Sequence, residues 1–358
     1  MKLVIETLSP VHIGSEQKYH SIDYICESGK VRIISESKLM EKLSEKGIIE
    51  EYISEVKTGE IKSGKDIKRF ARKHGVRFDD VIEREIPADD EISGEISSYI
   101  KTDGKYYMPG TSIKGMIRTC VAYHYLKNNI SLLKKEIRNI WKKRAKYEFS
   151  ELNRRIFGDP HRDPFKNLLI KDSEFIEEKN IKIFNVRRLY IAKRVKGVPQ
   201  PCEAIVENTK INSEINLLNI PILNKNLKDV LTDLKNIFKI VNEFFEEFIK
   251  MEINEIKKAK EDNPIRSLID FYEDLLYKMK SLKQNECIGR IGFGKTFWCQ
   301  TVIMLIKDDK DILRQWENYQ NTKYWTKRRL KKYLPDTRAV IMKGENVIPP
   351  GWVKMSYS

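Results

Sequence analysis

The chain has 358 residues, 41% of them hydrophobic, which is enough to bury a substantial core in one large domain or two of ordinary size. No apolar run approaches the ~20 residues of a membrane span, and the N-terminus lacks the pattern of a signal peptide, so we expect a cytoplasmic protein without a membrane partner. Five cysteines without a CxxC pair argue against a disulfide framework and a zinc ribbon, and the net charge of +15 favours a polyanionic partner. The alternative is the surface of a hyperthermophile protein, which is rich in both Lys and Glu. Such a surface predicts equal numbers of positive and negative charges, not an excess of positive charge.

The first half of the chain reads as short strands and helices. Alternating hydrophobicity predicts strands at 2–8, 22–27 and 30–35. The last two flank Ser28-Gly29, which predicts a β-hairpin. Helices are predicted at 36–57, after Pro109-Gly110 as far as residue 127, and at 130–156. Thr111 or Ser112 is the expected N-cap of the second of these helices. Residues 58–104 show no clear pattern.

The second half combines strands with a long helical hairpin. Strands are predicted at 168–172, 182–192 and 202–207. Apolar residues recur at the helical period from 225 to 260, and again after the break at Asn263-Pro264. This pattern predicts a helical hairpin whose aromatic stripe belongs to the core or to a partner interface. Residues 287–306 read as a turn, a glycine loop and a strand. Short strands with interspersed helices indicate an α+β fold.

The first candidate site is the start of the helix after Pro109. Free N–H groups at a helix start attract anions, and Gly110 allows a close approach to them. Lys114 and Arg118 add positive charge, although the spacing is not that of a Walker A loop. We therefore expect RNA phosphate to bind at Gly110, Thr111, Ser112, Lys114 and Arg118. An ordinary capped helix with surface charges is the alternative.

The second candidate site is the glycine-rich segment from Gly289 to Lys295. Glycines let a backbone approach a ligand closely, and Phe293 could stack on a base. The spacing differs from the GxGxxG dinucleotide fingerprint. Expected RNA contacts are Arg290, Gly292, Phe293, Gly294 and Lys295. A glycine-rich turn between strands is the alternative.

The third candidate site is the loop with His12, Gly14 and Ser15, followed by His20. A histidine titrates near neutral pH, so His12 or His20 could act as general base in RNA cleavage, with the 2′-OH as nucleophile. Neither has a recognisable orienting partner in the sequence, so a packing or phosphate-binding role is favoured. Asp23 could hold Mg²⁺, but no DxD cluster accompanies it. We expect no metal, no cofactor and no catalytic residue.

Basic runs with nearby aromatic residues complete the candidate surface. Arg187 and Arg188 lie in a predicted strand next to Tyr190, where they could contact phosphates. Further runs lie at 142–144, 193–196 and 327–332. A single run is usually a solvated face, but together with the net charge these runs favour a nucleic-acid surface.

In order and spacing, these motifs resemble the RAMP superfamily of CRISPR proteins. The residues that carry the resemblance are Leu8-Ser9-Pro10-Val11-His12-Ile13-Gly14-Ser15, Ile22-Asp23-Tyr24, Met108-Pro109-Gly110-Thr111-Ser112-Ile113-Lys114-Gly115, Phe157-Gly158, the strand from Leu169 to Asp172, and Gly292-Phe293-Gly294-Lys295. The set spans roughly residues 1–305 and is most similar to the Csm-type RAMP subunit at the head of the type III-A effector complex.

The resemblance implies one or two ferredoxin-like (RRM-like) domains, which we expect at 1–165 and 166–358, the second with a helical insertion at 222–284. It also implies assembly beside backbone RAMP subunits of the Csm complex, contact with the 3′ region of the crRNA, and help in crRNA maturation by recruiting cellular nucleases. Backbone subunits of such complexes cleave target RNA with a loop aspartate. Asp23 instead begins a predicted strand, which disfavours cleavage by this chain.

Three hypotheses follow for the function. The leading one is a non-catalytic crRNA-binding cap subunit that serves antiviral defence. The second is a CRISPR-associated RNA endonuclease that uses His12, His20 or a metal-bound Asp23. The third is a protein-binding scaffold whose charged surface reflects only adaptation to a hot habitat. RNA binding and cleavage, measured with and without EDTA, separate the three.

Overall fold

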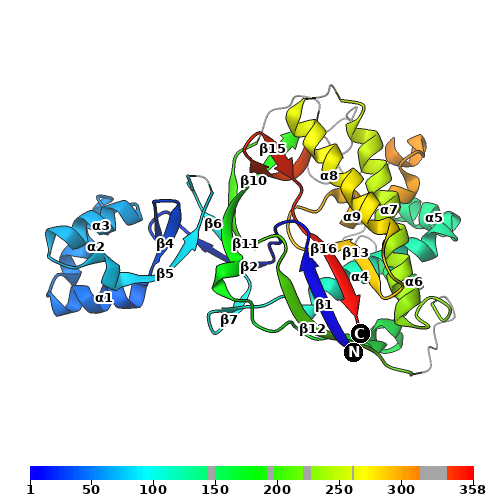
Figure 1. The fold of residues 1–358 in the computed structure, drawn as a ribbon, viewed down its shortest axis with the longest axis horizontal. Coiled ribbons are helices and arrows are strands. Elements are labelled where there is room, and N and C mark those ends of the chain that lie inside the picture. Colours follow the sequence, from blue (N-terminus) through cyan, green and yellow to red (C-terminus); the bar gives the residue numbers. More distant parts are fainter. Residues whose placement is uncertain are drawn as a thin grey trace.

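The chain folds into a large body from which a smaller lobe projects (Figure 1). The structure is a computed structural model, and it describes residues 1–89, 91–143, 150–191, 197–220, 227–259, 262–300, 302–314 and 337–358. Runs of strands and runs of helices follow one another through the described residues, which confirms the α+β prediction. Three basic runs named above lie wholly or partly outside the described residues, namely 142–144, 193–196 and 327–332.

A five-stranded antiparallel sheet brings the two ends of the chain together (Figure 1). Its order is β13–β16–β1–β12–β9, with bounds Glu286–Arg290, Trp352–Tyr357, Lys2–Thr7, Lys210–Leu217 and Leu168–Ile170. In β1 every second residue is buried, as the alternation of its sequence predicts. The first strand thus lies between a strand from the middle of the chain and the last strand.

A six-stranded sheet forms the other layer of the body. Its order is β15–β14–β10–β11–β6–β2, with bounds Asn346–Ile348, Thr337–Lys343, Ile181–Tyr190, Gln200–Ile205, Ile96–Tyr99 and Gly14–Tyr19. Each large sheet therefore takes strands from both sides of residue 165, so the expected division at that point does not follow the sheets. A two-stranded ribbon, β7 (Lys101–Thr102) and β8 (Lys105–Tyr106), precedes the long helix α4.

The helices of the body pack on the five-stranded sheet, on the strand Asn346–Ile348 of the other sheet and on one another. Their bounds are Gly110–Lys127 for α4, Ile130–Lys143 for α5, Ser150–Phe157 for α6, Leu234–Ile256 for α7 and Asn263–Lys280 for α8. The helices α7 and α8 form the predicted hairpin, and each begins at an aspartate, Asp233 or Asp262, whose side chain caps the helix. The aromatic stripe of α7 is core, because Phe245 and Phe248 pack on the ring of Trp352 in β16.

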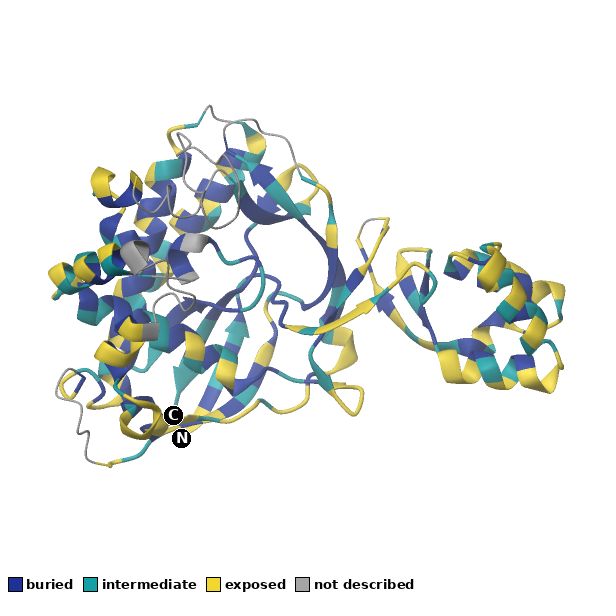
Figure 2. Cartoon of the chain, turned by 180° about the vertical axis from the view of Figure 1, so that it is seen from behind, coloured by how far each residue is buried: buried dark blue, intermediate teal, exposed yellow. Residues whose placement is uncertain are grey.

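The lobe has its own sheet and its own core. The sheet β3–β4–β5 (Tyr24–Glu27, Lys30–Ile34 and Ile82–Pro87) carries the helices α1 (Glu36–Glu45), α2 (Ile49–Thr58) and α3 (Gly64–Lys73). Twelve buried side chains of residues 25–81 form a cluster separate from the core of the body, and Figure 2 shows buried residues in both parts. Ser28 and Gly29 both have positive φ, as the predicted two-residue hairpin turn requires.

Several local predictions are wrong. The helix expected at 36–57 is divided into α1 and α2 at Gly47, which has a φ of 68°. The helix expected to be capped by Thr111 or Ser112 begins earlier, with Pro109 as N-cap. The glycine loop follows a strand, β13, and precedes the short helices Phe297–Gln300 and Ile303–Ile306. Among the described residues, no helix has the length and hydrophobicity needed to cross a bilayer.

Candidate RNA-binding surface

The loop that follows β1 and the glycine loop that follows β13 lie against each other. Phe293 N donates to His12 O at 2.8 Å, and Gly351 N donates to Pro10 O at 2.8 Å. Gly292 has a φ of 71°, and a Cβ at this position would lie 2.2 Å from His12 O. Only glycine fits this close approach, so two motifs that are nearly 300 residues apart in the sequence form one surface.

His12 is the buried residue at this junction. Its Nδ1 lies 2.5 Å from the carbonyl oxygen of Glu203. A carbonyl oxygen can only accept, so Nδ1 carries the proton and Nε2 is left as an acceptor. Burial lowers the pKa of His12 below its usual value, which keeps the imidazole neutral near pH 7. The ring also packs edge-on against Phe293, with centroids 5.8 Å apart.

A cleft of about 530 Å³ opens beside His12. Its lining includes the side chains of His12, Lys18, Glu95, Ser97, Gln200 and Phe293. The guanidinium carbon of Arg188 lies 5.9 Å from the centroid of the Phe293 ring. A half-buried aromatic ring with a cation beside it and amide and hydroxyl groups nearby is suited to holding an unpaired nucleotide.

The other predicted residues of these motifs differ in accessibility. Gly14 is exposed, Ser15 is half-buried, and Arg187 and Arg188 are half-buried on β10. Arg290 is only 1% exposed, and its guanidinium donates to Pro350 O at 2.9 Å and to Gly294 O at 3.0 Å. These bonds fix the glycine loop, and they keep Arg290 away from any ligand at the surface. Burial also lowers the pKa of Lys295.

The start of α4 already holds an anionic group. Gly110 N donates to Asp172 Oδ1 at 2.8 Å, so a carboxylate of this chain occupies the position expected for a phosphate. A Cβ at Gly110 would lie 2.2 Å from Ile170 O, which means that the glycine permits close packing on the end of β9. Thr111 is exposed and Ser112 half-buried in the first turn.

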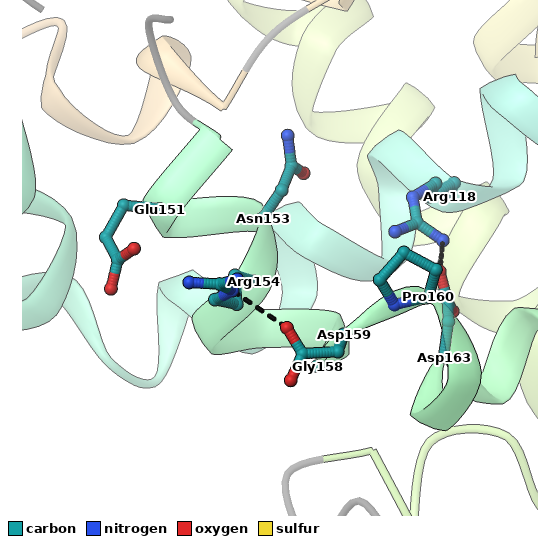
Figure 3. A pocket seen from close by; sticks show the side chains of 8 residues that line it. All are labelled: Arg118, Glu151, Asn153, Arg154, Gly158, Asp159, Pro160 and Asp163. Carbon is teal, nitrogen blue, oxygen red and sulfur yellow. Dashed lines mark hydrogen bonds and ion pairs between the residues drawn. The ribbon is translucent and has the colours of Figure 1, made fainter.

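Arg118 is also held by the chain itself, as Figure 3 shows. Its Nη1 donates to Asp163 Oδ2 at 2.7 Å, and its guanidinium carbon lies 3.6 Å from the centroid of the Phe157 ring. These residues lie at a second cleft of about 550 Å³, whose lining also includes Arg154 and Asp159. Burial lowers the pKa of the neighbouring Lys114, while Asp163 has the opposite effect. The structure thus divides the predicted residues into a group around His12 and a group around α4.

A buried carboxylate, Glu203, supports the cleft and was not predicted from the sequence. Its oxygens accept from Tyr99 N at 2.7 Å, from Arg84 Nη2 at 3.1 Å and from Lys101 Nζ at 3.1 Å. Arg84 belongs to β5 of the lobe, so this network joins the lobe to the body. The one signal in the sequence was an acidic residue inside the apolar run Pro201 to Val206.

The residues of the endonuclease hypothesis do not come together as a metal site. Asp23 Oδ2 accepts from His20 N at 2.7 Å, which is a turn contact. His20 Nδ1 lies 3.3 Å from Glu95 Oε1 on an exposed surface. Within the described ranges, no group of three or more His, Cys, Asp and Glu side chains is placed to hold a metal ion.

Comparisons with known proteins agree on a family. The CRISPR system Cms protein Csm5 of Methanocaldococcus jannaschii is 28% identical over 380 residues, covering 99% of this chain and 88% of that protein. The protein of the same name from Streptococcus thermophilus is 26% identical over 237 residues, covering 60% and 63%.

Two solved structures share the fold. A chain in the cryo-EM structure of a Csm–crRNA–target RNA ternary complex of a type III-A CRISPR-Cas system has a TM-score of 0.80 and 20% identity, with 99% of this chain and 100% of that chain covered. The crystal structure of T. onnurineus Csm5 has a TM-score of 0.67 and 20% identity, with 98% and 99% covered. The family model of the RAMP superfamily matches residues 4–297, and the chain therefore belongs to the RAMP superfamily.

Proposed function

We propose that this chain is a crRNA-binding cap subunit of a Csm-type, type III-A CRISPR effector complex. The observation that carries the proposal is the meeting of the His12 loop and the glycine loop at one cleft, with Phe293 and Arg188 beside it. The similarity over nearly the full length to a chain of a Csm–crRNA–target RNA complex supports the same assignment. The chain works in the cytoplasm, beside backbone RAMP subunits.

The cleft would take an unpaired nucleotide from the 3′ region of the crRNA. Phe293 stacks on a base, Arg188 contacts a phosphate, and the exposed backbone at Gly14 and Ser15 lies along the RNA. Arg187 extends from the opposite face of β10, because neighbouring residues of a strand point to opposite sides of the sheet. Arg290, Gly292 and Gly294 shape the loop from within. Lys114 and Arg118 form a second contact, for which Arg118 must exchange Asp163 for a phosphate. In this role the chain is non-catalytic and helps maturation by bringing cellular nucleases to the crRNA end.

A gel-shift experiment with labelled crRNA tests this proposal. We expect a salt-sensitive shift and intact RNA, in Mg²⁺ and in EDTA alike. Phe293→Ala should cost about 1–3 kcal/mol of binding free energy, because a stacking platform is lost. Arg188→Ala should reduce the slope of log K against log salt concentration by about one. Tyr277→Ala removes an aromatic side chain that is 74% exposed on α8, and it should change neither quantity. An equal loss of RNA affinity in all three variants would contradict the assigned surface.

One observation favours a second candidate function, metal-independent RNA cleavage. His12 lines the cleft, is neutral near pH 7 and keeps Nε2 as an acceptor, which is the state of a general base. Cleavage that survives EDTA and disappears in His12→Ala would establish this activity in place of the non-catalytic role. Intact RNA after incubation with the unsubstituted chain would exclude it.

A further inference from the structure

The lobe carries none of the chain's excess positive charge. Residues 20–88, from the end of β2 to the end of β5, contain 14 basic and 14 acidic side chains, whereas the whole chain carries +15. The entire excess therefore lies in the body. RNA binding draws on cations that neutralise phosphates, and a neutral lobe offers no surplus of them.

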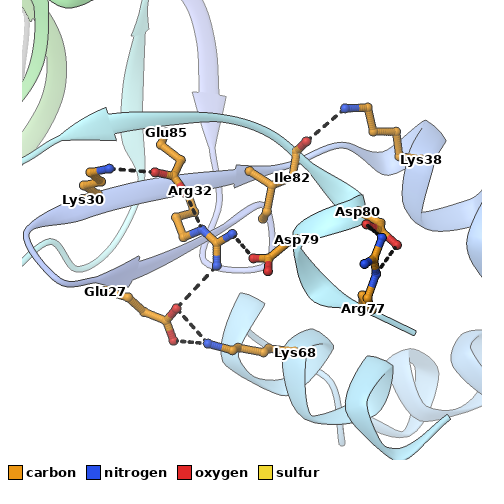
Figure 4. A network of polar contacts seen from close by, with 10 residues as sticks. All are labelled: Glu27, Lys30, Arg32, Lys38, Lys68, Arg77, Asp79, Asp80, Ile82 and Glu85. Atoms are coloured by element: carbon orange, nitrogen blue, oxygen red, sulfur yellow. Dashed lines mark hydrogen bonds and ion pairs between the residues drawn. The ribbon is translucent and has the colours of Figure 1, made fainter. Parts of the chain in front are cut away.

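The cations of the lobe are also engaged by neighbouring carboxylates, as Figure 4 shows. Arg32 Nε donates to Glu85 Oε1 at 2.9 Å, and Lys68 Nζ donates to Glu27 Oε1 at 2.6 Å. At least eight of the 14 cations form ion pairs, namely Lys30, Arg32, Lys42, Lys68, Arg69, Lys73, Arg77 and Arg84. Because the lobe has no net charge to attract a polyanion and most of its cations already have carboxylate partners, a protein is the better partner for the lobe.

An open apolar groove of about 400 Å³ crosses the helical face of the lobe. Its floor includes Leu39, Tyr52 and Ile67, which also belong to the core of the lobe. The aliphatic side chains Ile22, Met40 and Ile53 are only partly buried, and Val56 is 36% exposed. Asp23 and Glu36 contribute acidic groups to the lining, and Lys57 contributes a basic one. A groove of this size accepts a few aliphatic side chains of one short segment.

We propose that this groove binds a short amphipathic helix of a neighbouring protein subunit, with aliphatic side chains inserted between α1 and α2. The charges of the groove specify the helix further. Two carboxylates and one ammonium group call for a lysine or arginine opposite Asp23 and Glu36. The proposal rests on the proposed function, since it assigns the lobe to assembly with the protein subunits and leaves RNA to the body.

Assembly with the purified subunits of the Csm-type complex tests this proposal. The full chain and its variants are mixed with those subunits and crRNA, and the assembled fraction is measured by mass photometry. Val56→Glu introduces a charge into the groove at a position that is already partly exposed, and it should weaken assembly at least tenfold. Glu36→Lys, on an exposed helix position, should weaken assembly several-fold and more strongly at low salt. Ile220→Glu is the matched control in the body, where the side chain is 46% exposed.

The outcomes separate the two proposals. If the unsubstituted chain neither assembles nor binds RNA, the proposed function and the assigned partner are both overturned. If it assembles and Val56→Glu and Glu36→Lys assemble equally well, only the groove proposal is overturned. A photo-crosslinking amino acid at position 56 identifies the occupant. A crosslink to a basic amphipathic helix of a subunit supports the proposal, whereas a crosslink to crRNA or to a second copy of this chain overturns it, as does no crosslink in the assembled complex.

Discussion

Gly292 is the residue at which the two motif loops of the cleft touch. Its φ is 71°, and a Cβ would meet His12 O at 2.2 Å, so both the backbone conformation and the contact require glycine. Gly104 has almost the same φ, 73°, but a Cβ there would meet nothing within 4 Å. The two positions therefore separate the cost of the conformation from the cost of the contact.

We predict that Gly104→Ala lowers the free energy of unfolding by about 1–2 kcal/mol, the cost of left-handed backbone in an L-residue. Gly292→Ala should add a further loss on the order of 1–3 kcal/mol, because the methyl group forces the two loops apart. Urea unfolding of both variants measures the difference. If both variants lose a similar free energy of unfolding, the His12 loop and the glycine loop can move apart without an energetic cost.

His12 makes the stability of the fold depend on pH. Its pKa is lower in the folded chain than the usual 6.5, chiefly because of burial. Between these two pKa values the unfolded chain binds more protons, so stability rises with pH through this window. The contribution of His12 is thus complete above about pH 6.5 and is lost as the pH falls through the folded pKa.

We predict that His12→Gln flattens the dependence of unfolding free energy on pH below about pH 6.5. Urea unfolding at a series of pH values measures this slope. A His12→Gln slope equal to that of the unsubstituted chain would mean that His12 titrates alike in both states.

At the scale of elements, β11 joins the lobe to the body through Glu203. The carboxylate is fully buried and balances two cations, Arg84 from β5 and Lys101 from β7. Removing one partner of a buried ion pair leaves charge uncompensated, which costs far more than the pair itself contributes.

We predict that Glu203→Gln destabilises the chain by about 3–5 kcal/mol. It should also make the root of the lobe more accessible to limited proteolysis near β5. Glu214→Gln removes a mostly exposed partner of Lys171, and its effect should fall within experimental error. Equal thermal stability of the two variants would contradict a role for Glu203 in holding the lobe to the body.

At the scale of the whole molecule, the net positive charge lies in the body, and so does the proposed RNA contact. We predict that Arg187→Gln with Arg188→Gln reduces the salt slope of RNA binding by about one, because only Arg188 lies beside Phe293 and loses a phosphate contact. Lys46→Gln with Lys65→Gln removes the same charge from exposed positions of the lobe, and it should leave the slope unchanged. Gel shifts at several salt concentrations measure both slopes, and an equal reduction would mean that the lobe also contacts RNA.

The sequence alone determined the features that depend on near neighbours. Turn chemistry predicted the hairpin at Ser28-Gly29, and helical periodicity predicted the hairpin of α7 and α8. The ordered motifs identified the family, and the composition indicated a polyanionic partner. Each of these rests on residues close together in the chain, or on a simple count of them.

The tertiary structure decided which of the predicted residues share a surface. Because β1 lies between β12 and β16, the His12 loop meets the glycine loop, and a strand order of this kind follows from long-range pairing that no local pattern reveals. The same packing buries Arg290, pairs Arg118 with Asp163 and places Asp172 at the start of α4. A sequence shows that a side chain is charged, but only the fold determines whether a partner in the chain already neutralises that charge.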